Sequence, residues 1–263
     1  MTGLLIGNVG PGGSGKSHLL RSCAAVGKTA VALTDPLEEV FYKGTPNLTY
    51  EIFDDDDEWR PAVNQFETSA YNRLAKWIAA RYNDDTKFVG LDNGTELSDV
   101  TMHAACQMYS IAAPGDIGYG KAYTAHDSNY ISLIRELRRL TKKGKIVIVN
   151  FHGKMKEMEG AGMPEKKPGF QGTELQFEEK YLPVMATSLR QSISQMFPLW
   201  LHAKTTGSGP GTKYFVTAIP DEARAAKNRV KFKSKVNGRP VLLSMLPNTM
   251  KELLEVIETD AKA

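Results

Sequence analysis

One short motif near the start of the chain constrains its fold more than any other feature. Residues 10–17 read Gly-Pro-Gly-Gly-Ser-Gly-Lys-Ser and match the phosphate-binding pattern G-x-x-x-x-G-K-[ST] at every fixed position. Glycines let backbone N–H groups curl around phosphate oxygens, because no Cβ atom stands in the way. An apolar run at residues 4–6 predicts a buried strand, and residues 16–27 predict a helix whose N-terminus faces the anion. The motif therefore predicts a nucleoside triphosphate site at a strand–loop–helix junction.

The motif also assigns roles to individual side chains. Lys16 is expected to reach the β- and γ-phosphates, and the Ser17 hydroxyl is expected to hold Mg²⁺. The sequence contains no [N/T]-K-x-D motif for reading guanine, so ATP is the expected nucleotide. The residues expected to bind it are Gly10, Gly12, Gly13, Ser14, Gly15, Lys16, Ser17 and the adjoining His18.

The pattern of apolar residues along the chain predicts an α/β fold. Expected strands cover residues 3–8, 29–34, 88–92 and 145–150, and expected helices cover 16–27, 61–82, 97–109 and 128–142. Such alternation predicts a mainly parallel sheet flanked by helices. Antiparallel strands are expected near 181–187, 197–203, 213–219 and 229–235, before a terminal helix near 248–260. With no repeat or low-complexity linker, we expect one domain over 1–263, with its core at about 1–152 and the C-terminal strands and helix at about 173–263.

Composition sets limits on location and partners. The formal net charge is only +3, so the chain as a whole favours no particular charged partner. Cys23 and Cys106 fall in expected helices and suit small core residues of a reduced, cytoplasmic protein. No apolar run approaches the length of a transmembrane helix, and the phosphate-binding loop begins too early for a signal peptide to precede it. We therefore expect a soluble protein that does not bind membranes.

Polar residues at the ends of expected strands supply further candidates for chemistry. Asp92 ends an apolar strand, which is where a P-loop NTPase places the acid that holds Mg²⁺. Asn93 follows it, at a position where many ATPases carry the glutamate that activates the attacking water. The catalytic base is therefore open among Glu38, Glu96 and Asp35.

Two later positions are candidates for contacts with the γ-phosphate. Asn150 and His152 lie at the end of another apolar strand, and one of these side chains is expected to sense the γ-phosphate. Lys227 and Arg229 are two residues apart at an expected strand, so their side chains point the same way. Two cations with this spacing can reach one phosphate group, including that of a neighbouring subunit.

Together, these features resemble the RecA/RadA-type ATPases. The resemblance rests on the loop 10–17, the strand 88–92, the strand ending Asn150-Phe151-His152 and the late Lys-x-Arg, and it covers about residues 1–235. The chain most closely resembles the short phage-encoded members of this group, which are associated with recombination by single-strand annealing. It implies a RecA-like P-loop NTPase core that binds ATP and Mg²⁺. It also implies a homo-oligomeric ring or filament, in which Lys227 and Arg229 act as trans fingers on a neighbour's nucleotide.

The same resemblance implies a path for single-stranded DNA. In RecA-like proteins this path is lined by loops that correspond here to residues 112–127 and 153–172, which are rich in groups that suit phosphates and bases. Those groups are Tyr119, Lys121, Tyr123, Lys154, Lys156, Lys166, Lys167 and Phe170. The implied activity is ATP hydrolysis coupled to DNA annealing or recombination, in the host cytoplasm if the chain is phage-encoded. The chain departs from full recombinases, because Asp35-Pro36-Leu37-Glu38 matches their catalytic-glutamate pattern only loosely and their N-terminal DNA-binding or polymerisation region has no counterpart.

Two other classes of protein stay open. A nucleoside or nucleotide kinase usually closes an Arg-rich lid over the donor phosphates, and the candidate segment 153–172 has lysines but no arginine. A nucleotide-gated assembly protein with negligible turnover would fit the asparagine after Asp92. The ATPase rate with and without single-stranded DNA separates these classes from a DNA-dependent ATPase.

Overall fold

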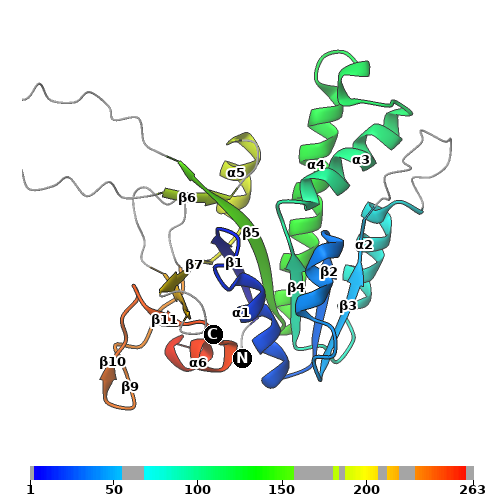
Figure 1. Ribbon diagram of the computed structural model, residues 1–263. Coiled ribbons are helices and arrows are strands. Elements are labelled where there is room, and N and C mark those ends of the chain that lie inside the picture. Colours follow the sequence, from blue (N-terminus) through cyan, green and yellow to red (C-terminus); the bar gives the residue numbers. More distant parts are fainter. Residues whose placement is uncertain are drawn as a thin grey trace, which may run out of the picture.

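A computed structural model describes residues 3–54, 68–156, 180–183, 187–206, 212–218 and 229–258. Its main feature is one large sheet, with strand order β11-β8-β7-β1-β5-β4-β2-β3 and with β6 paired to the far end of β5 (Figure 1). The strands are β1 (Leu4–Gly10), β2 (Thr29–Leu33), β3 (Leu48–Ile52), β4 (Phe88–Asp92), β5 (Ile146–Lys156), β6 (Lys180–Pro183), β7 (Leu199–Thr206), β8 (Lys213–Thr217) and β11 (Leu246–Pro247). A separate small hairpin joins β9 (Lys235–Val236) and β10 (Arg239–Pro240).

The central strands of this sheet are parallel. β7, β1, β5, β4, β2 and β3 run in one direction, and β8 and β11 extend the β7 edge as antiparallel strands. β1 lies between β7 and β5, so β5 separates it from β4. This topology confirms the predicted RecA-like P-loop α/β fold. One part of the expectation was wrong, since β7 pairs in parallel with β1 and is antiparallel only to β8.

Helices cover both faces of the sheet. The strand residues alternate between two apolar clusters, because successive side chains of a strand point to opposite faces. One cluster packs against α2 (Ala70–Ala80), α3 (Leu97–Tyr109), α4 (Lys121–Leu140) and α5 (Thr187–Ser194), and the other against α1 (Lys16–Ser22) and α6 (Met250–Val256). In β1, Leu5 and Val9 join the first cluster and Ile6 joins the second. The phosphate-binding loop therefore follows a strand that is buried on both faces.

Several element bounds differ from the sequence-based expectation. α4 begins at Lys121 and not at 128, so the expected loop 112–127 is helical over its last seven residues. Gly120, at φ 63°, is the residue from which this helix begins. β5 continues to Lys156 and pairs with β6, so the start of the expected loop 153–172 is a strand. The part of that segment beyond residue 156 lies outside the described residues.

Other differences concern the edges of the sheet. In place of the expected strand at 229–235, the structure has an isolated bridge from Phe232 to Ile257 and the start of β9 at Lys235. β3 and α5 had no counterpart in the expectation, and α6 is shorter than the predicted terminal helix. No helix in the described part of the chain is long and apolar enough to cross a membrane.

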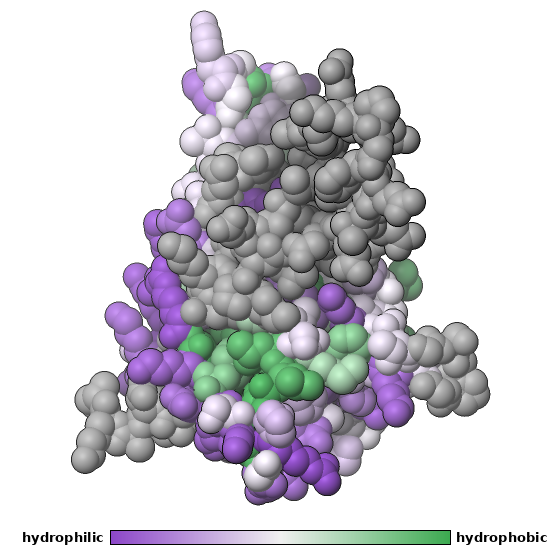
Figure 2. Space-filling view, turned by 90° about the vertical axis from the view of Figure 1, so that its left-hand side faces the viewer, coloured by the Kyte–Doolittle hydropathy of each residue, from purple (hydrophilic) through white to green (hydrophobic). Residues whose placement is uncertain are grey.

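The surface on the side of β9, β10 and β11 carries an apolar patch bordered by polar residues (Figure 2). Leu242 and Met245, between β10 and β11, are both more than half exposed.

Candidate nucleotide site

The loop between β1 and α1 has the backbone that its glycines permit. Gly13 has φ 73° and Gly15 has φ 88°, in the left-handed region that favours glycine. Gly15 is restricted a second time, because a Cβ atom there would lie 2.5 Å from Cδ1 of Tyr214. The Asn248 amide, which precedes α6, donates to the Gly15 carbonyl at 2.9 Å. Residues from the C-terminal part of the chain therefore hold the loop in place.

Lys16 is folded back on this loop. Its side chain is buried, and its amine donates to the carbonyls of Gly10 at 3.0 Å and Pro11 at 2.8 Å. Burial lowers the pKa of Lys16, although the negative charges of Asp92 and Glu38 oppose that shift. The amine is thus held by neutral acceptors at the mouth of a site that contains two carboxylates.

These two carboxylates compete for one hydroxyl. Asp92, 1% exposed at the end of β4, accepts from Ser17 Oγ at 2.8 Å and from the hydroxyl of buried Tyr42. Glu38, on the 3₁₀ helix η2 (Pro36–Phe41), lies 3.2 Å from the same Ser17 oxygen. A serine hydroxyl has one proton to donate, so it cannot satisfy both acids at once. Burial raises the pKa of Asp92, and burial together with the charge of Asp92 raises that of Glu38.

This donor set fits Mg²⁺. The ion prefers oxygen ligands and is usually held by one or two carboxylates together with phosphate oxygens and water. Asp92, Glu38 and Ser17 offer such oxygens, and a divalent cation would neutralise the surplus negative charge. In the described residues, no group of three or more His, Cys, Asp and Glu side chains could hold a metal ion alone. Bound phosphate would therefore need to complete the coordination.

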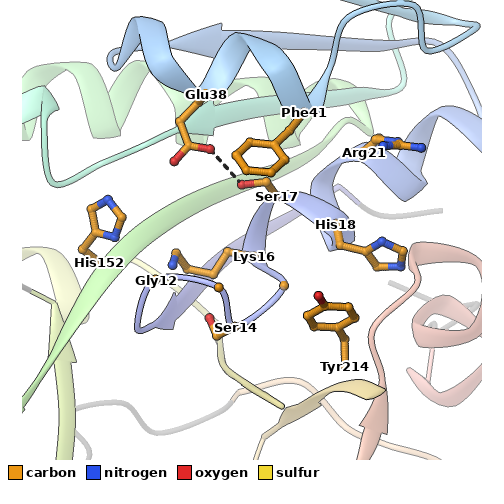
Figure 3. Close-up of a pocket in the computed structure, with 12 residues that line it drawn as sticks. Gly12, Ser14, Lys16, Ser17, His18, Arg21, Glu38, Phe41, His152 and Tyr214 are labelled. Carbon is orange, nitrogen blue, oxygen red and sulfur yellow. Dashed lines mark hydrogen bonds between the residues drawn. The ribbon is translucent and has the colours of Figure 1, made fainter. Parts of the chain in front are cut away.

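The pocket around the loop has two chemically different ends. At one end, Glu38, His152 and the Lys16 amine lie around one space (Figure 3). At the other end, the rings of His18 and Tyr214 are stacked, with centroids 5.7 Å apart and an angle of 21° between the planes (Figure 3). The complete lining is Gly12, Gly13, Ser14, Gly15, Lys16, Ser17, His18, Arg21, Glu38, Phe41, His152 and Tyr214.

Tyr214, Asn248, Arg21 and Phe41 were not among the predicted site residues. Tyr214 lies on β8, which pairs with the edge strand β11. It is far in sequence from residues 10–17. Arg21 and Phe41 lie on α1 and η2 beside predicted residues, and their position on those helices was the only sequence signal available.

The two candidates for the γ-phosphate sensor occupy different places. His152 lines the pocket and is half-buried, and its Nε2 lies 3.0 Å from Nδ2 of Asn93. Asn150 is fully buried beneath the site, where its Oδ1 accepts from Asn8 at 3.0 Å.

The candidates for the catalytic base also occupy different places. Glu96 lies before α3 beside Asp99 and is not a lining residue, so Glu38 is the candidate base that the fold brings to Ser17.

The predicted trans fingers and DNA loops are only partly described. Arg229 is exposed, and its backbone N–H donates to the Pro198 carbonyl at 2.8 Å. It is not part of a strand, and Lys227 lies outside the described residues, so the shared direction of their side chains stays a prediction. Tyr119, Lys121 and Tyr123 are exposed at the start of α4. No side chain is described for the remaining expected DNA contacts, which are Lys154, Lys156, Lys166, Lys167 and Phe170.

Of three comparisons with known proteins, the one with family models identifies a family for the chain. A search of curated proteins found no match to the chain. Among solved structures, the chain is similar to the flagellar accessory protein FlaH from Methanocaldococcus jannaschii, with 12% identity and a TM-score of 0.39 over 98% of this chain and 90% of that one. The family model of the AAA domain matches residues 3–230, which include the phosphate-binding loop, Glu38, Asp92 and His152. The chain belongs to the AAA domain family of P-loop ATPases.

Proposed function

We propose that the protein binds ATP with Mg²⁺, hydrolyses it, and uses the cycle to control annealing or recombination of single-stranded DNA in a homo-oligomer. The observation that carries the nucleotide part is the shared contact of Asp92 and Glu38 with Ser17 beside Lys16. Two carboxylates, one hydroxyl and a lysine at a glycine-rich loop are the parts required to hold Mg²⁺ and a triphosphate.

The opposite end of the pocket supports a nucleotide over a simple polyphosphate. Burial and the nearby charge of Arg21 lower the pKa of His18, which favours an uncharged ring stacked on Tyr214. A flat nucleobase can extend this stack, because aromatic rings interact favourably when offset and parallel. The phosphates would then run along the loop from the rings toward Lys16, Glu38 and His152.

The residues divide the chemical work. Lys16 would exchange its two carbonyl acceptors for phosphate oxygens, and Ser17 and Asp92 would hold Mg²⁺, which withdraws charge from the phosphates when bound. Glu38 would accept the proton of the attacking water, a role that suits a carboxylate with a raised pKa. His152 would contact the terminal phosphate. Arg229 would act on the nucleotide of a neighbouring subunit.

Two variants test the ATPase assignment. Lys16→Ala is expected to lose ATP binding, measured by titration calorimetry, because the cation for the terminal phosphates is gone. Glu38→Gln keeps shape and is expected to bind ATP normally while its hydrolysis rate falls by about 100-fold or more, the usual value of a positioned general base. Normal ATP affinity in Lys16→Ala would reject the site, and an unchanged rate in Glu38→Gln would reject the base.

The DNA part rests on the resemblance and on Tyr119, Lys121 and Tyr123, which expose two rings and a cation at the start of α4. Such groups bind the bases and phosphates of single strands. Its test is the ATPase rate with and without single-stranded DNA, together with the molecular mass in solution under both conditions. Stimulation and assembly support the proposal. A requirement for a small phosphate acceptor would indicate a kinase, and DNA-independent assembly without turnover would indicate an assembly protein.

The neighbouring-subunit role of Arg229 has its own test. Arg229→Ala is expected to bind ATP normally and to lose hydrolysis, because a trans finger stabilises the transition state in another subunit's site. Equal loss of binding and hydrolysis would argue against that role. Mixing this variant with Lys16→Ala, which retains Arg229, should restore part of the activity.

A further inference from the structure

Asn93 is fixed from several sides next to the pocket. It is fully buried directly after Asp92, and its backbone N–H donates to Thr34 Oγ1 at 3.0 Å. The Thr34 hydroxyl in turn donates to the Asn93 carbonyl. The side-chain Oδ1 accepts from the backbone N–H of Glu96 at 2.8 Å, and Nδ2 lies 3.0 Å from Nε2 of His152. The asparagine thus connects the start of α3 to a histidine that lines the nucleotide pocket.

The contact with Glu96 determines which way the Asn93 amide points. A backbone N–H can only donate, so the amide atom facing it must be the oxygen. The NH₂ group therefore faces the ring of His152. Because an amide NH₂ can only donate, the Nε2 atom of His152 must accept through its lone pair.

An accepting Nε2 fixes the protonation of the ring. In a neutral imidazole one nitrogen carries the proton and the other accepts, so the proton of His152 is on Nδ1. The doubly protonated ring would set an N–H against the Asn93 NH₂ group, and two donors repel. Of the charged groups around the ring, Lys16 also disfavours the cation whereas Asp92 and Asp35 favour it, and burial makes the net shift of the His152 pKa downward.

We propose that Asn93 is a positioning residue that holds His152 as the neutral Nδ1–H tautomer, so that the ring offers one N–H donor to the terminal phosphate of a bound triphosphate. This inference rests on the proposed ATP site. The backbone of His152 is held as well, since its N–H donates to Thr95 Oγ1 at 2.9 Å. A diphosphate has no oxygen at that place, so the donor would favour ATP over ADP.

A carboxylate at position 93 would reverse this arrangement. It would accept from Nε2–H, which leaves Nδ1 either as a lone pair, repelled by phosphate, or as part of a charged ring. The asparagine that follows Asp92 is therefore more than a missing glutamate. It selects the form of His152 that can donate to phosphate without a permanent charge.

The tautomer can be measured directly without any nucleotide. Long-range ¹H–¹⁵N NMR spectra distinguish protonated from unprotonated imidazole nitrogens, and loss of one signal set in His152→Gln assigns His152 among the five histidines. The expected result for the wild-type protein near neutral pH is a protonated Nδ1 and an unprotonated Nε2. In Asn93→Asp the proton is expected on Nε2, alone or in addition to Nδ1. An unprotonated Nδ1 of the assigned His152 in the wild-type protein overturns the proposal, even if Asn93→Asp does not fold.

The functional readout is the ratio of the dissociation constants for ADP and ATP. His152→Gln, and Asn93→Asp at a pH where its Nδ1 is unprotonated, should lower this preference for ATP by about tenfold, the effect of one hydrogen bond to a charged group, with ADP affinity within about twofold of wild type. Ser98→Ala is the matched control, because Ser98 lies on α3, the helix that follows Asn93, and contacts Nε2 of a different histidine, His126, at 2.9 Å. It should change only the His126 signals. An unchanged preference in Asn93→Asp, with Lys16→Ala still abolishing ATP binding, would overturn this inference alone.

Discussion

Replacing Asp92 with asparagine is expected to stabilise the nucleotide-free protein and to remove its response to Mg²⁺. The Asp92 carboxylate is 1% exposed and accepts from two neutral hydroxyls, while the nearest cation, Lys16, donates to backbone carbonyls. Burial raises the pKa of Asp92, and an acid whose pKa is higher in the folded state costs stability once the pH exceeds that value. At neutral pH, where the unfolded chain carries this acid ionised, burial of Asp92 therefore costs the folded protein stability.

Asparagine keeps the shape of the side chain and both contacts, since the Ser17 and Tyr42 hydroxyls donate to one atom, Oδ2, and the amide oxygen in that place can accept from both. Removal of a buried, incompletely compensated charge is then worth about 1–2 kcal/mol of stability. For a chain of 263 residues, a change of this size raises the melting temperature by about 2–8 °C. The gain is a direct measure of what the empty metal site costs the fold.

Thermal unfolding followed by circular dichroism measures both effects. With Mg·ATP at 100 times its dissociation constant, the wild-type protein should gain about 2.7 kcal/mol, whereas Asp92→Asn should gain nothing on addition of Mg²⁺ to ATP. Asp85→Asn is the control, because this exposed acid pairs with Lys28 at the surface and its loss should matter little. A melting temperature for nucleotide-free Asp92→Asn several degrees below wild type would refute the reasoning about burial.

Three further predictions follow from other contacts. Asp84→Asn should lower the free energy of unfolding, measured in urea, by about 3 kcal/mol. The reason is that the buried Lys145 amine, 2.9 Å from Oδ1 of Asp84, loses its counter-charge. A loss under 1 kcal/mol would contradict this. Although burial raises the pKa of Asp84, hydrogen bonds from Lys145, Arg81 and Thr86 lower it from 3.8 to about 2, so wild-type stability should fall between about pH 4 and pH 2 more steeply than that of Asp84→Asn. Gly15→Ala should lower ATP affinity at least tenfold by calorimetry, because its Cβ would meet the Tyr214 ring, whereas Gly12→Ala has open space and should remain folded with the same melting temperature.

The sequence was sufficient where a short segment carries the whole signal. The phosphate-binding loop has fixed spacing, and the runs ending at Asp92 and His152 are apolar enough to identify buried strands. Their ends meet at one edge of the sheet because the strands are parallel. Glu38 could be identified only as a candidate, and its distance of 3.2 Å from Ser17 depends on how η2 packs against α1.

The sequence was insufficient where tertiary contacts decide. Tyr214 and Asn248 reach the loop because β8 and the segment before α6 pack beside it, over separations that no local pattern reports. The start of α4 was missed for a different reason. Its first two turns bury only Ala122 and His126 and expose Lys121 and Tyr123, so the apolar period that marks a helix is weak there.

Strand order explains why the chemistry of Asn93 could not be read from its position in the sequence. β5 lies between β1 and β4, and its register places His152 opposite Gly10, at the mouth of the phosphate-binding loop. Because β5 lies between β1 and β4, His152 also lies beside Asn93, the residue that follows Asp92. If β4 were the neighbour of β1, Asn93 would have no histidine to orient, and the missing glutamate would be its only notable feature. In the observed order, Glu38 reaches Ser17 from η2 while Asn93 contacts His152, so the proposed proton acceptor and the proposed phosphate sensor lie on different segments, η2 and β5, that meet at the pocket.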